Sequence, residues 1–228
     1  MRISTLMLSA AALAAAPATA ATNLVVNGDF EAGNSGFNSG YSYVGTPGDF
    51  AMYSEGTYTV GESARDYHNL WADFGAFEGD LFFIANGSTG NDLPAWQQTL
   101  TGLTVGASYT FSAYAVNVCC NADFGGPNAN PFIVAVRTDG GTETIATSGA
   151  VTGTGQWLQF SGTFIATATT ANLSIFNDNN QASGNDYGLD LISVTAVPEP
   201  ATWAMMVGGF GVIGAAARRR ARASVTFA

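Results

Sequence analysis

The chain of 228 residues contains no lysine and a single histidine, and only 11% of its residues are charged. Of its seven arginines, only Arg65 and Arg137 lie between residues 21 and 197. The same stretch holds sixteen of the seventeen acidic residues, so its formal charge is −14. Such a surface repels phosphate backbones, which excludes nucleic-acid binding as a function. It also disfavours anionic lipid and anionic polysaccharide as ligands and favours a neutral glycan or calcium.

Cysteine is scarce as well, since Cys119 and Cys120 are the only two and are neighbours in the chain. Adjacent Cα atoms lie about 3.8 Å apart across a trans peptide, closer than an ordinary disulfide prefers. A bond between the two closes no useful loop, so the pair adds little stability by loop closure. A vicinal disulfide, two free thiols and an intermolecular bond all remain open. With no cluster of Cys and His nearby, we expect no zinc site.

Motifs of catalysis are also missing from the sequence. There is no nucleophile elbow, no metalloprotease histidine pair and no phosphate-binding loop. The lone histidine, His68, has no nearby nucleophile to pair with, and we expect it to be structural. A pair of carboxylates for glycoside hydrolysis could be hidden among sixteen acids, because the fold sets their separation. The acids fall mainly at turns, however, and we predict that the protein is not an enzyme.

The first twenty residues have the form of a signal peptide. Arg2 supplies a positive start, residues 6–16 are apolar, and Ala18-Thr19-Ala20 is a small-x-small cleavage site. The apolar run is too short for a transmembrane helix. We expect signal peptidase to cut after Ala20 and the protein to be exported across the inner membrane of a bacterium.

A second apolar run, residues 201–217, lies near the other end of the chain. It carries no charge and, as a helix, is just long enough to cross the hydrocarbon of a bilayer. Basic residues directly behind it would hold that end in the cytoplasm. These are Arg218, Arg219, Arg220 and Arg222. We therefore predict a transmembrane helix over residues 201–217, with everything before it outside the cytoplasm.

The tail resembles the PEP-CTERM protein-sorting signal, in its variant with Trp-Ala after the PEP triplet. The residues that carry the resemblance are Pro198, Glu199, Pro200, Trp203, Ala204, Met205, Met206, Gly209, Phe210, Gly211, Arg218, Arg219 and Arg220. Two prolines around a carboxylate disfavour a helical turn, which leaves the triplet extended and accessible ahead of the membrane. The resemblance implies processing over residues 197–222 by an exosortase, with release or attachment at the cell surface. A permanent single-pass anchor is the alternative.

Residues 21–196 are expected to fold as one all-β domain. Apolar and polar residues alternate in short runs, and turn signals separate the runs at about the 8–12-residue spacing of β-sandwiches. No stretch shows a convincing helical period. A first short strand is expected within residues 23–31. The other expected strands are 41–44, 57–60, 79–87, 96–100, 109–116, 131–137, 143–146, 156–165, 171–177 and 185–194.

The two ends of this domain resemble the first and last strands of galactose-binding-like jelly rolls, the sandwich of many carbohydrate-binding modules. The resemblance rests on residues 23–31 and 185–194, although Asp190 is followed by leucine where the family often has a second acid. It implies a structural calcium ion held by side-chain oxygens of Glu31 and Asp190 and by the carbonyl oxygen of Asp29. The alternative is that these acids are solvated residues of turns and strand edges.

We therefore expect an exported, non-enzymatic protein of the cell surface or exopolysaccharide layer, with a carbohydrate-binding-like module. PEP-CTERM proteins as a group are associated with exopolysaccharide-producing bacteria, so an extracellular polysaccharide is an implied partner. Sugar sites of such sandwiches combine aromatic rings with amides and carboxylates. The aromatic candidates are Trp71, Trp96, Trp157, Tyr114 and Tyr187. The alternative is a structural matrix or biofilm component without a defined pocket.

Overall fold

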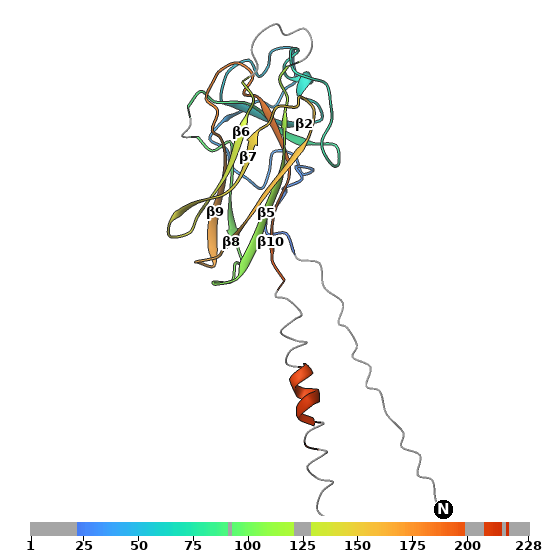
Figure 1. Ribbon diagram of the computed structural model, residues 1–228. Helices are drawn as coiled ribbons and strands as arrows, with labels where there is room; N and C mark the ends of the chain where they lie inside the picture. The colour runs from blue at the N-terminus through green and yellow to red at the C-terminus, as the bar shows by residue number, and fades with distance from the viewer. Residues whose placement is uncertain (1–21, 91–92, 121–128, 199–207, 216–217, 219–228) are drawn as a thin grey trace, which may run out of the picture.

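The computed structural model describes residues 22–90, 93–120, 129–198, 208–215 and 218. The predicted signal peptide lies outside these residues, as does much of the predicted transmembrane helix. Residues 208–215, which belong to that run, are helical and largely exposed (Figure 1). Across the parts of the chain described, no helix has the length and apolar character needed to cross a membrane.

The body of the molecule consists of β-strands joined by turns and long loops, with one 3-10 turn, η1 (Ala64–Asp66). The strands are β1 (Ser42–Tyr43), β2 (Thr57–Gly61), β3 (Phe82–Asn86), β4 (Trp96–Thr101), β5 (Ser108–Asn117), β6 (Phe132–Thr138), β7 (Thr142–Ala150), β8 (Leu158–Ile165), β9 (Thr170–Asn177) and β10 (Tyr187–Ala196). Each overlaps a strand that was expected from alternating apolar and polar residues. The buried positions of β4 and β9 alternate in this way.

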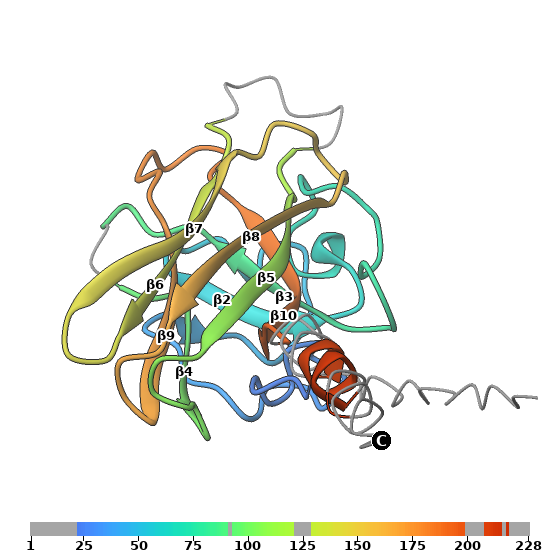
Figure 2. The ribbon, with the colours of Figure 1, turned by 60° about the horizontal axis from the view of Figure 1, so that its bottom comes forward.

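The strands form two sheets that face each other as a sandwich, which confirms the predicted all-β sandwich (Figures 1 and 2). One sheet has the order β1-β2-β3-β10-β5-β8 and the other the order β4-β9-β6-β7. Neighbouring strands are antiparallel throughout, except for the short parallel pair of β1 and β2. The last strand, β10, is therefore an inner strand between β3 and β5.

Two apolar clusters hold the sandwich together. The larger lies between the sheets and includes Phe83, Phe111, Trp96 and Leu173, which are fully buried. The smaller includes Trp71, Phe82 and Ile84, together with residues from the long connections before and after β2. Phe82 and Ile84 alternate along β3 with Phe83 of the first cluster, so β3 is buried on both faces.

The expectation of a first strand within residues 23–31 is wrong in detail. This segment forms bends and turns, and its non-glycine residues Asn27 and Phe30 have positive φ angles of 53° and 58°. Such angles lie in the left-handed region, which interrupts a strand. The segment still lies beside β10, because the Asn23 side chain bonds the backbone of Ile192 and Val194. Side-chain bonds thus replace part of the expected ladder.

The direction of the strands separates two ends of the sandwich. β3 and β5 run toward the end where β10 begins, since Tyr187 pairs with Ala85 and Asn117. At the opposite end the backbone N–H of Val197, just after β10, donates to the carbonyl oxygen of Ser108. The chain leaves the sandwich at this second end (Figure 1).

Candidate functional site

A cavity of about 640 Å³ opens at the end of the sandwich where β10 begins. Its walls come from five separate parts of the chain, which are the loop before β2, the loop after η1, the end of β3, the residues after β5 and the loop before β10. The lining residues used below are Tyr53, Glu55, His68, Trp71, Asn86 and Asp186. The described residues that line the cavity include no arginine and no lysine.

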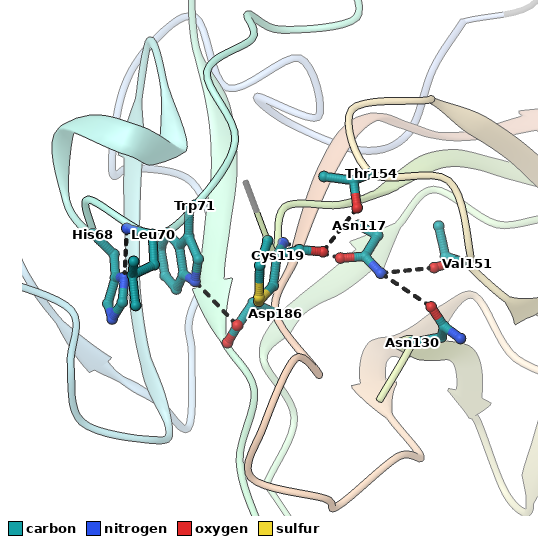
Figure 3. Close-up of a disulfide and its surroundings, with 10 residues drawn as sticks. His68, Leu70, Trp71, Asn117, Cys119, Asn130, Val151, Thr154 and Asp186 are labelled. Atoms are coloured by element: carbon teal, nitrogen blue, oxygen red, sulfur yellow. Dashed lines mark hydrogen bonds between the residues drawn. A yellow bond between two sulfur atoms is a disulfide. The ribbon is translucent and has the colours of Figure 1, made fainter. Parts of the chain in front are cut away.

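The Trp71 indole and the Asp186 carboxylate form the innermost polar contact of the cavity (Figure 3). Trp71 Nε1–H donates to Asp186 Oδ2 over 3.0 Å, and both residues are buried, with exposed fractions of 1% and 5%. The other oxygen, Asp186 Oδ1, is buried and makes no hydrogen bond of ordinary geometry within the described residues. A carboxylate in this position is poorly compensated, because burial removes water without supplying a cation.

Two carboxyl groups of the cavity have raised pKa values for this reason. The pKa of Asp186 is raised to about 7, chiefly by burial and to a smaller extent by the charge of Glu55, while the Trp71 N–H and the nearby Gly87 amide lower it. Partial burial likewise raises the pKa of Glu55 to about 7. Glu55 is exposed as a residue, so solvent screens its carboxylate at the rim. Carboxyl groups that lie in one cavity and have shifted pKa values are typical of functional sites.

Aromatic rings line one side of the same cavity. His68 lies between Tyr53 and Trp71 in a stack, with ring centroids 6.3 Å and 5.0 Å away and planes within 6° and 22°. Tyr53 is 72% exposed, and Phe50 meets both Tyr53 and His68 edge to face. Burial lowers the pKa of His68, which favours the neutral imidazole. Its Nδ1 accepts a hydrogen bond from the Leu70 backbone, so the ring is fixed rather than poised as a base (Figure 3).

The two cysteines also line the cavity, where they are joined in a disulfide (Figure 3). Of the three states that the sequence left open, the structure has the vicinal disulfide. Cys119 is buried and pairs with Trp71 in an isolated β-bridge. Its backbone is held further by the side chains of Asn117 and Thr154. The disulfide therefore adds a sulfur surface to the cavity beside the Trp71–Asp186 contact.

The aromatic candidates from the sequence are placed differently by the structure. Trp96 and Tyr187 are fully buried and cannot contact a sugar. Trp71 lines the cavity, but at 1% exposure it does not offer an open ring face. Tyr114 and Trp157 are half-buried away from the cavity, where Phe77 stacks on Tyr114 with centroids 3.7 Å apart. Sequence reasoning missed the exposed Tyr53 and Phe50, which carry no pattern that separates them from loop residues.

The predicted calcium ligands are only partly brought together. Glu31 Oε1 accepts the backbone N–H groups of Asp80 and Leu81, and Asp190 Oδ2 accepts those of Phe77 and Glu78. Both carboxylates thus hold the same loop, and the charge of Glu31 contributes to the raised pKa of Asp190. Asp29 is exposed and lines a separate depression of about 430 Å³ with Leu191.

Glu31 and Asp190 are the two predicted calcium ligands that bind the same loop. Burial, the largest cause, raises the pKa of Asp190 to about 6, so its carboxylate lacks a positive partner. The described residues contain no group of three or more His, Cys, Asp or Glu side chains placed to share a metal ion. Backbone carbonyls would have to complete the shell. Calcium therefore stays a prediction, with Glu31 and Asp190 as the residues that would hold it.

A family model described as the PEP-CTERM protein-sorting motif matches residues 196–220. The chain carries a PEP-CTERM sorting motif. This confirms the resemblance seen in the tail, and the motif indicates export and a surface or extracellular location. It also implies processing by an exosortase, a membrane enzyme.

The structure describes part of the PEP-CTERM motif, namely residues 196–198, 208–215 and 218. Pro198 lies two residues after the end of β10, and Arg218 is exposed. The other predicted sorting residues lie outside the described part of the chain. They are Glu199, Pro200, Trp203, Arg219 and Arg220.

Comparison with solved structures finds sandwich domains of several sugar-binding proteins. The CBM22-1 xylan-binding domain of Xyn10C from Paenibacillus barcinonensis is 17% identical, with 80% of this chain and 99% of that chain covered and a TM-score of 0.49. TmCBM61, solved with β-1,4-galactotriose, is 14% identical, with 77% and 99% covered and a TM-score of 0.48. The C-terminal domain of the sugar-binding protein EclA is 22% identical, with 45% of this chain and 66% of that chain covered and a TM-score of 0.37. No curated protein matches the chain.

Proposed function

We propose that the chain is an exported, non-enzymatic protein of the cell surface or exopolysaccharide layer, whose body binds carbohydrate in the end cavity. Its fold is that of a galactose-binding-like jelly roll, and an exosortase processes its C-terminal signal. The observation that carries the proposal is the cavity itself, which joins an aromatic stack to a buried, half-satisfied carboxylate.

The size and lining of the cavity support a small-molecule or oligosaccharide ligand. Its volume of about 640 Å³ lies within the usual range of roughly 300–1,000 Å³ for ligand sites. Tyr53 lines the cavity and exposes ring surface on which the apolar face of a sugar can pack, and the exposed Phe50 ring contacts Tyr53 edge to face. Asp186 Oδ1 and Asn86 Oδ1 are buried acceptors without partners, and sugar hydroxyls are donors that would satisfy both.

The position of the cavity also suits a surface protein. It opens at the end where β10 begins, and the sorting motif continues from the end where β10 finishes. A body held by its C-terminal tail would therefore direct the cavity away from the membrane. An extracellular polysaccharide could reach it there.

Binding is favoured over hydrolysis, although two carboxyl groups with raised pKa values also suggest an acid–base pair. Asp186 is held by the Trp71 indole deep in the cavity, while Glu55 is exposed to solvent at the rim. The two carboxyl groups are thus in different surroundings, one in contact with the indole and the other with water. An assay for new reducing ends on bound glycans is expected to show none.

A glycan array tests the proposal with the full chain, purified in a non-ionic detergent that has no sugar headgroup. Saturable binding that is lost in Tyr53→Ala is expected. Tyr43→Ala is the matched control, because Tyr43 is an exposed tyrosine that does not line the cavity. Absence of saturable binding to every glycan would overturn the proposal and favour the matrix or biofilm component without a pocket.

A further inference from the structure

The charge balance of the end cavity narrows the class of its ligand. Its two carboxyl groups, Glu55 and Asp186, line the cavity together with His68 and Tyr53, and burial lowers the pKa of that histidine. The two arginines of the body are elsewhere. Arg65 is exposed on η1, and Arg137 is buried in ion pairs with Asp139 and Glu143. The segment of residues 121–128, which follows the disulfide, contains no basic residue in its sequence.

The unpartnered polar atoms of the cavity are all of one kind. Asp186 Oδ1 and Asn86 Oδ1 both accept hydrogen bonds, and both are buried without a partner in the part of the chain described. The Asn86 amide nitrogen is already used, since it donates to the Met52 carbonyl oxygen over 2.7 Å. A ligand must therefore bring donors, and the donor that also compensates a buried carboxylate is a cation.

The aromatic wall fits the same ligand. Tyr53, His68 and Trp71 are stacked beside the carboxylate of Asp186, and aromatic ring faces attract ammonium groups. The body as a whole, with its formal charge of −14, concentrates cations around it. The aromatic rings, the unpartnered acceptors and the negative charge thus all favour a ligand with an ammonium group.

We propose that the cavity binds an amino sugar through its free, protonated amine, which donates to Asp186 and Asn86 and lies beside the Tyr53–His68–Trp71 stack. This inference rests on the proposed function and names the glycan class. It departs from the expectation of a neutral glycan, because the protonated amine gives the sugar a positive charge. Glu55 at the rim attracts the ammonium group and completes its neutralisation.

A matched pair of ligands tests the proposal, namely the trimer of glucosamine and the same trimer with every amine acetylated. The two differ in charge and keep the same sugar backbone. Calorimetric titration of the full chain near neutral pH, where both carboxyl groups with pKa values of about 7 are partly ionised, is expected to show tighter binding of the free amine by about tenfold or more. Added salt should weaken the binding of the glucosamine trimer and leave the acetylated trimer unchanged.

Two variants locate the effect in the cavity. Asp186→Asn keeps an acceptor for the Trp71 indole and is expected to remove the preference for the free amine. Glu55→Gln, at the solvated rim, should reduce that preference without a risk to folding. Asp178→Asn is the control, because Asp178 is exposed and does not line the cavity.

The outcomes separate this inference from the proposed function. Equal or tighter binding of the acetylated trimer overturns the amine proposal while leaving carbohydrate binding in place. A preference for the free amine that survives in both carboxylate variants overturns it as well. If neither trimer binds, the amine proposal fails, and the glycan array decides separately whether the cavity takes another sugar.

Discussion

Trp71 and Asp186 are 115 positions apart in the chain, and the indole N–H of one donates to the buried carboxylate of the other over 3.0 Å. The contact joins the loop after η1 to the residue that precedes β10. It fixes a carboxylate whose second oxygen is unpartnered. The depth and charge of the cavity depend on this pair.

Trp71→Phe should therefore reduce both stability and binding. The substitution removes the indole N–H that donates to Asp186 and opens space beside a buried side chain, with an expected cost of about 2–4 kcal/mol in the free energy of unfolding. Trp157→Phe is the matched control, since Trp157 is half-buried and its indole makes only a 3.4 Å contact to Gly75. Urea unfolding measures the free energy of unfolding of both variants. An equal decrease in the two would show that the hydrogen bond to Asp186 adds no stability of its own.

The raised pKa of Asp186 predicts an unusual pH dependence of stability. The unfolded carboxyl loses its proton near its ordinary value of 3.8, whereas the folded one keeps it until about 7. Its contribution to stability is thus complete below the lower value and is lost as the pH rises through the upper one. Asp186→Asn lacks this titration. Relative to the variant, the natural chain should lose on the order of 3 kcal/mol between about pH 4 and pH 8.

Urea unfolding of both chains across this pH range measures the difference. Asp178→Asn, at an exposed site, should follow the natural chain at every pH. A stability difference that does not change with pH would mean that Asp186 titrates normally. The raised pKa then could not be attributed to burial without a cation.

Calcium is expected to stabilise the body through Glu31 and Asp190. At a concentration of one hundred times the dissociation constant, a bound ion adds about 2.7 kcal/mol to the free energy of unfolding. The melting temperature should rise with calcium and return after chelation. Asp190→Asn should abolish the rise, and Asp178→Asn should preserve it. An unchanged melting temperature at millimolar calcium would end the calcium prediction.

The sorting motif predicts that the chain is shortened in a host with an exosortase. Mass spectrometry of the mature protein should show that the residues after the Pro-Glu-Pro triplet of the motif have been removed. Replacement of the Pro198-Glu199-Pro200 triplet by alanines should leave the uncut form. Replacement of Ser224-Val225-Thr226, outside the motif, is the control. Persistence of the full-length form of the natural chain would favour the permanent anchor.

Most of the sandwich was predictable because its strands are half-buried. Alternation of apolar and polar residues is enforced wherever one face meets the core and the other meets water, as in β4 and β9. The prediction of a strand within residues 23–31 was wrong because the positive φ angles at Asn27 and Phe30 leave no periodic signal in the sequence. The tail was predictable for another reason, since a sorting signal is read as a linear peptide.

The residues of the cavity were much harder to predict from the sequence. Trp71 was named as a candidate and His68 as structural, but Glu55 and Asp186 were indistinguishable from the other acids. What sets them apart is their place in one cavity, which arises only when five distant segments meet at one end of the sandwich. Spacing along the chain carries no information about such an assembly.

The place of β10 between β3 and β5 has a mechanical consequence for a protein held by its C-terminal tail. Drag on the body pulls along this inner strand, so the load is shared by two ladders of hydrogen bonds in shear. An edge strand would peel away one rung at a time. A tail that continues from β10 is therefore joined to an inner strand and not to an edge strand.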